Sequence, residues 1–274
     1  MILYKYVPFS AGIKILEGNS LLFSQPETFN DPFDMPSYPD EPGEDLDAAI
    51  FGRLRTIVKN SAWAENTGIL SLTRTPANAL MWAHYADKHQ GMVIGIDVEA
   101  AGFTDEKTNL IPAQFGSVIY VSRRVTGPFS SKPTTSLAVG ATHHFPVDHY
   151  EKLQRVFLHK PLTWAYEEEV RVIKSLHGMQ DGTATTASGS FTVDSSQERR
   201  LHLYILPESA IREVYFGIRS DLNAAEKVAM RLGEVRPSVS IFESVLDNGA
   251  LSVGAQPYVS LSETLNAEIG ASGA

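Results

Sequence analysis

The chain has 274 residues, of which 43% are hydrophobic and 20% are charged, a composition typical of a folded globular protein. Its 32 acidic and 23 basic residues give a formal net charge of −9, which argues against a broad surface for duplex nucleic acid. Because the chain has no cysteine, disulfides, thiolate metal sites and cysteine nucleophiles are excluded. No apolar run reaches the roughly 18 residues of a membrane span, and the first residues lack a signal-peptide layout. We therefore expect a soluble, cytoplasmic protein without a membrane partner.

Short strands and helices are predicted to alternate along the first half of the chain. β-Branched and aromatic residues predict strands at 2–7, 21–23, 68–73, 92–98 and 118–121. Apolar residues at helical spacing predict helices at 10–16, 46–62 and 76–88. The segment at 26–34 is rich in turn-forming residues and predicts a loop.

The second half of the chain is predicted to contain more strands than helices. The predicted strands are at 169–173, 200–206, 213–216 and 238–246, and the predicted helices are at 147–159 and 221–232. Runs of Ser, Thr, Gly and Ala predict a loop or an ordered excursion at 126–142 and a mobile loop at 178–190. Because no repeat or composition break divides the chain, we expect one α+β domain over 1–261 and a small polar tail at 262–274.

Two of the predicted strands carry polar residues that are candidates for a site. In the first strand, alternation places Lys5 on the face opposite its neighbours Tyr4 and Tyr6. The simplest interpretation is an edge strand with one solvated lysine and two packing tyrosines. In the strand at 68–73, Ser71 and Thr73 share one face.

A turn motif, Phe-Asn-Asp-Pro-Phe-Asp, occupies residues 29–34. Asn30 and Asp31 precede a proline, and both residue types form turns through hydrogen bonds from side chain to backbone. One interpretation is a rigid turn that holds two phenylalanines in the core. The other is that the turn forms one wall of a cleft, with Asp31 or Asp34 facing it.

The predicted helix at 76–88 carries the motif Met-Trp-Ala-His-Tyr-Ala at 81–86. Taken alone, His84 is more typical of a hydrogen-bonded structural histidine than of a catalyst. Tyr85 is more informative, because a flat aromatic ring on a helix can stack on a planar ligand ring.

The motif Trp-Ala-Tyr-Glu-Glu-Glu-Val-Arg at 164–171 combines carboxylates with a guanidinium. If 167–173 is extended, Glu167, Glu169 and Arg171 lie on one face of a strand. Burying these charges costs free energy unless they are paired. The motif therefore predicts either a Glu–Arg ladder that closes the sheet, or a carboxylate held by Arg171 beside a cleft.

Several common site motifs are absent from the sequence. The chain lacks the glycine-rich fingerprints of dinucleotide-binding and P-loop proteins, and it lacks the His-Glu-x-x-His and Gly-x-Ser-x-Gly motifs. His143, His144 and His149 cluster near Asp148 without an ordered ligand spacing, so no metal site is predicted.

The motifs, in their order, resemble a large bacterial family of unassigned function. The shared segments are Leu-Tyr-Lys-Tyr at 3–6, Phe-Asn-Asp-Pro-Phe at 29–33, Met-Trp-x-His-Tyr-Ala at 81–86 and Trp-x-Tyr-Glu-x-Glu-x-Arg at 164–171. This resemblance implies a shared fold but no established activity.

A weaker resemblance is to the ADP-ribosyltransferase superfamily, whose split, mixed β-sheet flanked by helices holds the nicotinamide end of NAD+. In residue terms, Lys5 is in the position of an early-strand Arg or His, although it is neither. The segment Ser71–Thr73 is similar to a Ser-x-Thr strand, Tyr85 to a stacking tyrosine, and Glu169 to the late-strand glutamate.

The second resemblance implies a role for each candidate residue and a cofactor. NAD+ is the implied co-substrate, and the implied catalytic residues are Glu169, Tyr85 and Lys5. The implied cofactor-binding residues are Tyr6, Ser71, Thr73, His84, Glu167, Arg171, Asn30 and Asp31. The implied biology is that of a bacterial toxin or anti-phage effector, with a macromolecular acceptor and a partner or antitoxin protein.

The leading hypothesis is therefore an NAD+-consuming, ADP-ribosyltransferase-like enzyme in which a late-strand glutamate stabilises the ribosyl cation. The alternative is a non-enzymatic module that binds a ligand or a protein, because each motif also has a structural interpretation. A third hypothesis is a metal-independent nuclease that uses His84, His159 and Arg171.

Overall fold

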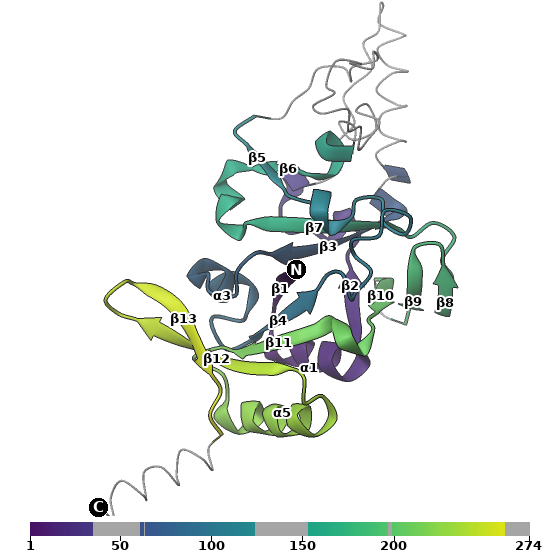
Figure 1. Cartoon of the computed structure of the whole chain (residues 1–274). Helices are drawn as coiled ribbons and strands as arrows, with labels where there is room; N and C mark the ends of the chain where they lie inside the picture. Colours follow the sequence, from purple (N-terminus) through teal and green to yellow (C-terminus); the bar gives the residue numbers. More distant parts are fainter. Residues whose placement is uncertain (35–60, 63, 124–152, 197–198, 261–274) are drawn as a thin grey trace, which may run out of the picture.

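The computed structural model describes residues 1–34, 61–62, 64–123, 153–196 and 199–260. At its centre is a mixed sheet of seven strands in the order β13-β12-β11-β4-β1-β3-β7 (Figure 1). Strands β11 and β12 pair in parallel, and the other neighbouring pairs are antiparallel. The strands are β1 (Ile2–Val7), β3 (Thr67–Thr73), β4 (Met92–Asp97), β7 (Glu169–Ser175), β11 (Ile211–Phe216), β12 (Ser240–Asp247) and β13 (Ser252–Pro257).

A second sheet of four strands packs beside the first, in the order β2-β10-β9-β8. Its strands are β2 (Ser20–Phe23), β8 (Gly182–Thr186), β9 (Gly189–Asp194) and β10 (Leu201–Ile205). A separate parallel pair is formed by β5 (Ile119–Val121) and β6 (His159–Pro161).

The prediction of a mobile loop at 178–190 is wrong, because this segment contains β8 and the start of β9. Threonines favour extended backbone, and here their hydroxyls pair across the hairpin. The Thr183 and Thr192 hydroxyl oxygens are 3.1 Å apart, and those of Thr185 and Ser190 are 2.9 Å apart. Strand β13 is an element that the sequence did not predict.

Three α-helices lie entirely within the described residues: α1 (Phe9–Gly18), α3 (Ala79–Tyr85) and α5 (Leu222–Val235). Helix α3 begins later than predicted, because the Asn78 side chain accepts from the backbone N–H groups of Leu80 and Met81 and so caps it. Asp221 caps α5 as predicted. The short 3₁₀ turns are η1 (Pro26–Thr28), η2 (Pro32–Asp34), η3 (Ala113–Phe115), η4 (Leu162–Glu167) and η5 (Glu208–Ala210).

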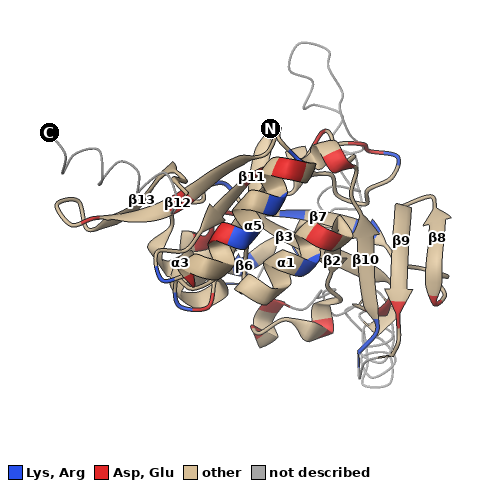
Figure 2. Cartoon of the chain, turned by 90° about the horizontal axis from the view of Figure 1, so that it is seen from below, with Lys and Arg blue, Asp and Glu red and all other residues tan. Residues whose placement is uncertain are grey.

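The two faces of the large sheet are covered differently. Helices α1 and α5 lie side by side on one face (Figures 1 and 2), and the buried residues beneath them form the main core together with the four-stranded sheet. Within that core the rings of Phe23, Phe103, Phe191 and Tyr204 pack on one another. Helix α3 packs on the other face through Trp82, whose ring meets Tyr6 edge-on. These layers confirm the expected α+β fold, with mixed strands and flanking helices.

Some predicted segments fall outside the described residues. These are the whole predicted loop at 126–142, most of the predicted helix at 46–62, the first part of the predicted helix at 147–159, and the tail at 262–274. Residues 153–157 are helical, as predicted, and the helix ends before β6. No helix among the described residues is long and apolar enough to cross a membrane.

The large sheet opens between β1 and β3. These strands are in register at one pair, Tyr4 with Thr73. Further along β3, Ile69 instead exchanges both backbone hydrogen bonds with Ser24, which follows β2. The two strands therefore separate beyond the pair of Tyr4 and Thr73, and the candidate site lies in the opening between them.

Candidate functional site

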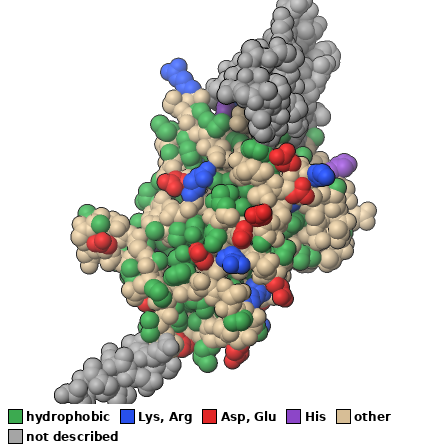
Figure 3. Space-filling view, in the orientation of Figure 1, with side chains coloured by type: hydrophobic (Ala, Val, Ile, Leu, Met, Phe, Trp, Pro, Cys, Tyr) green, Lys and Arg blue, Asp and Glu red, His purple; other side chains and the backbone are tan. Residues whose placement is uncertain are grey.

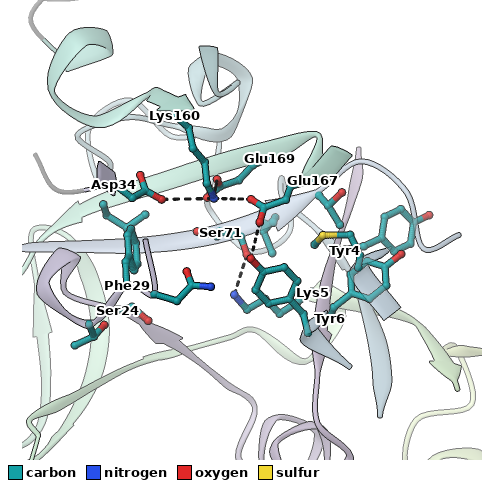
Figure 4. Close-up of a pocket in the computed structure, with 17 residues that line it drawn as sticks. Tyr4, Lys5, Tyr6, Ser24, Phe29, Asp34, Ser71, Lys160, Glu167 and Glu169 are labelled. Atoms are coloured by element: carbon teal, nitrogen blue, oxygen red, sulfur yellow. Dashed lines mark hydrogen bonds and ion pairs between the residues drawn. The ribbon is translucent and has the colours of Figure 1, made fainter. Parts of the chain in front are cut away.

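A cavity of about 340 Å³ lies at the opening between β1 and β3 (Figure 4). Its volume is within the range of small-molecule sites. Four parts of the chain line it: β1, the turns after β2, β3 with α3, and the segment from β6 to β7. The lining residues are Tyr4, Lys5, Tyr6, Ser24, Thr28, Phe29, Asn30, Asp34, Ile69, Ser71, Leu72, Thr73, Met81, Tyr85, Lys160, Glu167 and Glu169.

Lys5 bridges the opening in the sheet. Its Nζ donates to the backbone carbonyl of Ser71 at 2.9 Å and so satisfies an acceptor that β1 does not reach. Among the described residues, Lys5 takes part in no ion pair. Burial lowers the pKa of Lys5, although Glu169 and Glu167 oppose this shift. Within the described part of the chain, the acceptor for Lys5 is Ser71, which leaves two of the three ammonium N–H donors for a ligand.

Lys160 of β6 lies between three carboxylates (Figure 4). Its Nζ is 2.5 Å from Glu167 Oε2, 3.0 Å from Glu169 Oε2 and 3.5 Å from Asp34 Oδ2. Burial alone lowers the pKa of Lys160, but Glu169 and Glu167 raise it above its ordinary value. The lysine is therefore a fixed positive charge in the wall of the cavity.

Arg171 closes the wall behind Glu169. Its Nε donates to Glu169 Oε1 at 2.9 Å, one terminal nitrogen contacts both Asp34 oxygens at 2.6 Å, and the other donates to the Phe157 carbonyl. Arg171 is 1% exposed, and burial at this depth requires such complete pairing. Burial raises the pKa of Glu169, but Arg171 and Lys160 outweigh it and hold that pKa well below its usual range.

Tyr85 reaches the cavity from α3. Its hydroxyl donates to Glu167 Oε1 at 2.5 Å. Burial and the Glu167 carboxylate raise the pKa of Tyr85, so the phenol stays protonated. The helix is fixed to its neighbours at its first turn, because Tyr6 Oη accepts from the Asn78 N–H and Asn78 donates to the Tyr166 carbonyl.

The structure brings most of the predicted site residues to one cavity. Those that line it are Lys5, Tyr6, Asn30, Ser71, Thr73, Tyr85, Glu167 and Glu169. Thr73 is 1% exposed, and its hydroxyl has no hydrogen-bond partner among the described residues.

Three predicted residues do not line the cavity. Arg171 lies behind Glu169 and acts on it by pairing. His84 is exposed on α3, with its ring packed near that of Tyr166. Asp31 accepts from the Phe33 backbone N–H, which is a turn role. The interpretation with both phenylalanines in the core is wrong, because Phe33 is 67% exposed.

The predicted geometry of the Glu-rich motif needs one correction. Glu167 is the last residue of η4 and is not part of the strand, because Glu168 adopts a left-handed conformation with φ of 45°. The chain turns there, and β7 begins at Glu169. The charges of the motif are both buried and paired, because Glu167, Glu169 and Arg171 are all at least 96% buried.

Lys160 is the main site residue that the sequence reasoning missed. It stands between a histidine and a proline, a context that gives no local signal. An indirect signal existed: two buried glutamates beside one arginine leave a negative charge that needs a second cation. Asp34 lines the cavity, which agrees with the interpretation of the turn as one wall of a cleft.

The three residues of the nuclease hypothesis do not share the cavity. None of His84, His159 and Arg171 is among its lining residues. On the face seen in Figure 3, Lys and Arg side chains are scattered among Asp and Glu, without a broad basic patch. Among the described residues, no group of three or more His, Asp or Glu is placed to hold a metal ion. The cluster around His143 lies outside the described residues.

Comparison with protein-family models finds similarity over part of the chain. Residues 81–172 match the model of a family described as a protein of unknown function, DUF2971. Neither the curated proteins nor the solved structures gave a match. The matched segment contains Tyr85, Lys160, Glu167 and Glu169, whereas Lys5 and Ser71 lie before it. The chain is therefore similar to a domain family of unknown function over the segment that supplies Tyr85, Lys160, Glu167 and Glu169, whereas the third carboxylate, Asp34, also lies before the match.

Proposed function

We propose that the cavity binds NAD+ and that the protein breaks the bond between its nicotinamide and ribose. The observation that carries this proposal is the convergence of Lys5, Tyr85 and Glu169 at one opening in a sheet. These residues come from β1, α3 and β7, which are far apart in the sequence.

The lining chemistry supports a ligand that combines a planar ring, ribose hydroxyls and phosphate. Tyr85, Tyr6 and Phe29 offer aromatic faces for a ring. Glu167 and Glu169 can accept from ribose hydroxyls. The Lys5 ammonium has no carboxylate partner among the described residues, so a phosphate oxygen would neutralise it.

The proposed reaction uses charge that the cavity already holds. The bond between ribose C1′ and the nicotinamide nitrogen breaks, and its electron pair leaves with nicotinamide, which becomes neutral. The positive charge that develops on the ribose is stabilised by Glu169, which the low pKa keeps ionised. An acceptor hydroxyl or amine, or water, then attacks C1′ and gives its proton to Glu167 and on to solvent.

One observation favours a second candidate function, ligand binding without chemistry. Both oxygens of Glu169 accept hydrogen bonds, from Arg171 and from Lys160. These cations reduce the negative charge that Glu169 presents to a ribosyl cation. A cavity built in this way can hold a nucleotide without activating it.

Nicotinamide release from NAD+ by purified protein distinguishes the two candidates. The proteins compared are wild type, Glu169→Gln and the control Glu168→Gln. Glu168 is the control position because its side chain is exposed next to the site. Catalysis predicts release that Glu169→Gln abolishes and Glu168→Gln retains. Circular dichroism must show that Glu169→Gln is folded, because it replaces one of the buried carboxylates that pair with Arg171 by a neutral amide.

Calorimetric titration with NAD+ completes the test, because it does not depend on turnover. The binding module would be favoured if NAD+ binds in the titration but no nicotinamide is released, even when cell extract is added to the release assay to supply an acceptor. If NAD+ neither binds nor is consumed, the proposal is wrong for both candidates.

A further inference from the structure

A row of aromatic side chains begins at the cavity and crosses the face of the large sheet that carries α3. Tyr4 of β1 lines the cavity, and its ring meets that of Tyr215 of β11 edge-on, with centroids 6.0 Å apart. The Tyr215 ring stacks on that of Phe242 of β12 at 4.7 Å. Tyr4 and Phe242 are partly exposed, so this row reaches the surface.

A carboxylate, Glu213, lies within this row. Its Oε2 accepts from the Tyr215 hydroxyl at 2.7 Å, and burial together with the nearby Glu213 carboxylate raises the pKa of Tyr4. The strand between Tyr4 and Glu213 carries Gly95 at the same register. A Cβ there would lie 2.9 Å from Glu213 Cβ, so the glycine leaves the space that the carboxylate fills. The sequence thus provides room for Glu213 beside Tyr4.

Glu213 differs from the three carboxylates of the cavity in one respect. Asp34, Glu167 and Glu169 each contact a lysine or arginine. Glu213 is half-buried, but it forms no ion pair within the described part of the chain. A half-buried carboxylate surrounded by aromatic rings is suited to a cation, because ring faces and a carboxylate both attract one.

We infer that Glu213, Tyr4, Tyr215 and Phe242 form a subsite for a cationic side chain, arginine or lysine, of the acceptor polypeptide. The inference rests on the proposed function, since Tyr4 connects this subsite to the cavity where the ribose would react. The carboxylate and the net charge of −9 disfavour a nucleic-acid acceptor, whose phosphates they would repel.

The test measures binding of small probes without NAD+. Nα-Acetyl-arginine methylamide and its neutral analogue, Nα-acetyl-citrulline methylamide, are titrated into the full chain and followed by NMR. The variant Glu213→Gln keeps an acceptor for the Tyr215 hydroxyl. Its matched control is Glu226→Gln on α5, because Glu226 is also half-buried and accepts from a tyrosine hydroxyl, that of Tyr258, at 2.7 Å.

We expect the arginine probe to bind roughly tenfold more weakly to Glu213→Gln, in line with loss of one charge-assisted hydrogen bond. Glu226→Gln should bind like wild type, and the citrulline probe should bind weakly to all three proteins. Equal binding of the two probes, or no effect of Glu213→Gln, would overturn the inference. So would a single-stranded oligonucleotide that binds wild type and binds Glu213→Gln more tightly.

The arginine-binding test and the nicotinamide-release test can fail independently of each other. If Glu213-dependent arginine binding occurs without nicotinamide release, the cation subsite stands and the NAD+ proposal fails. If release occurs and the arginine probe does not bind, only the subsite is wrong.

Discussion

The ammonium of Lys160 lies 2.5 Å from a carboxylate oxygen of Glu167, and the Tyr85 hydroxyl donates to the other oxygen of the same carboxylate. Glu167 is therefore held at both oxygens, by β6 on one side and α3 on the other. Strand β6 and helix α3 are joined through this carboxylate at the cavity. The wall of the site and the stability of the fold consequently depend on the same contacts.

Replacing Lys160 by methionine should strongly destabilise the protein. The change removes the cation that lies between Asp34, Glu167 and Glu169, and it leaves three buried carboxylates with Arg171 alone. Breaking a buried ion pair in this way costs about 3–5 kcal/mol. Urea unfolding measures the difference, and Lys14→Met, an exposed lysine of α1, is the control. A loss below about 1 kcal/mol, the value of a surface pair, would contradict this account.

The variant Tyr85→Phe should show whether Tyr85 contributes to ligand binding as well as to the stability of the fold. It removes one hydrogen bond, to Glu167, and keeps the ring. We expect a loss of about 1–2 kcal/mol in the free energy of unfolding and weaker NAD+ binding. Tyr258→Phe is the matched control, because its hydroxyl also donates to a carboxylate, that of Glu226. Equal effects of both variants on NAD+ binding would show that Tyr85 has no role in the site.

The sequence predicted the site residues better than it predicted how they are arranged. Strand alternation correctly placed Glu169 with Arg171, because a period of two is imposed by the backbone itself. It wrongly extended the strand to Glu167, because a left-handed residue such as Glu168 has no reliable sequence signal outside glycine and asparagine. Strand β8 was missed for a related reason: its small, polar residues are as typical of a loop as of an edge strand.

Long-range contacts account for the rest of what could not be predicted. The opening between β1 and β3 depends on Ser24 pairing with Ile69, two residues 45 positions apart whose identities do not specify each other. The simplest interpretation of the first strand, an edge strand with a solvated Lys5, is wrong, because β1 lies between β4 and β3 and Lys5 reaches the Ser71 carbonyl within that opening. Such contacts follow from the topology of the sheet, and they become visible only in three dimensions.

Two glycine-to-alanine changes should have opposite effects. At Gly95 a methyl group would meet Glu213 Cβ at 2.9 Å and Ile2 Cγ2 at 3.2 Å, so Gly95→Ala should destabilise the sheet, by about 1–3 kcal/mol. At Gly233 in α5 a methyl group meets nothing within 4 Å, so Gly233→Ala should stabilise the protein by about 0.5–1 kcal/mol. Thermal melts of both variants test the pair, and a stabilised Gly95→Ala would refute the close packing of Glu213.

Lys174 should make the stability of the protein depend on pH. Its side chain is fully buried on β7, where Nζ donates to the carbonyls of Ser188 and Thr108 and lies 4.8 Å from the centre of the Tyr204 ring. Burial lowers the pKa of Lys174 from 10.5 to about 8. Between these two pH values the folded chain has released this proton and the unfolded chain still holds it. The free energy of unfolding should therefore rise with pH across this window, by up to about 3 kcal/mol from this residue.

The comparison with Lys174→Met isolates that effect, because the other titrating groups are common to both proteins. Below pH 8 the lysine is charged in both the folded and the unfolded chain, so the difference in stability between the two proteins should be constant there. From pH 8 to 10.5 wild type should gain on Lys174→Met, and above 10.5 the difference should level off. Urea unfolding at intervals of half a pH unit measures the curve. A difference that stays flat through this window would show that Lys174 has an ordinary pKa in the folded protein.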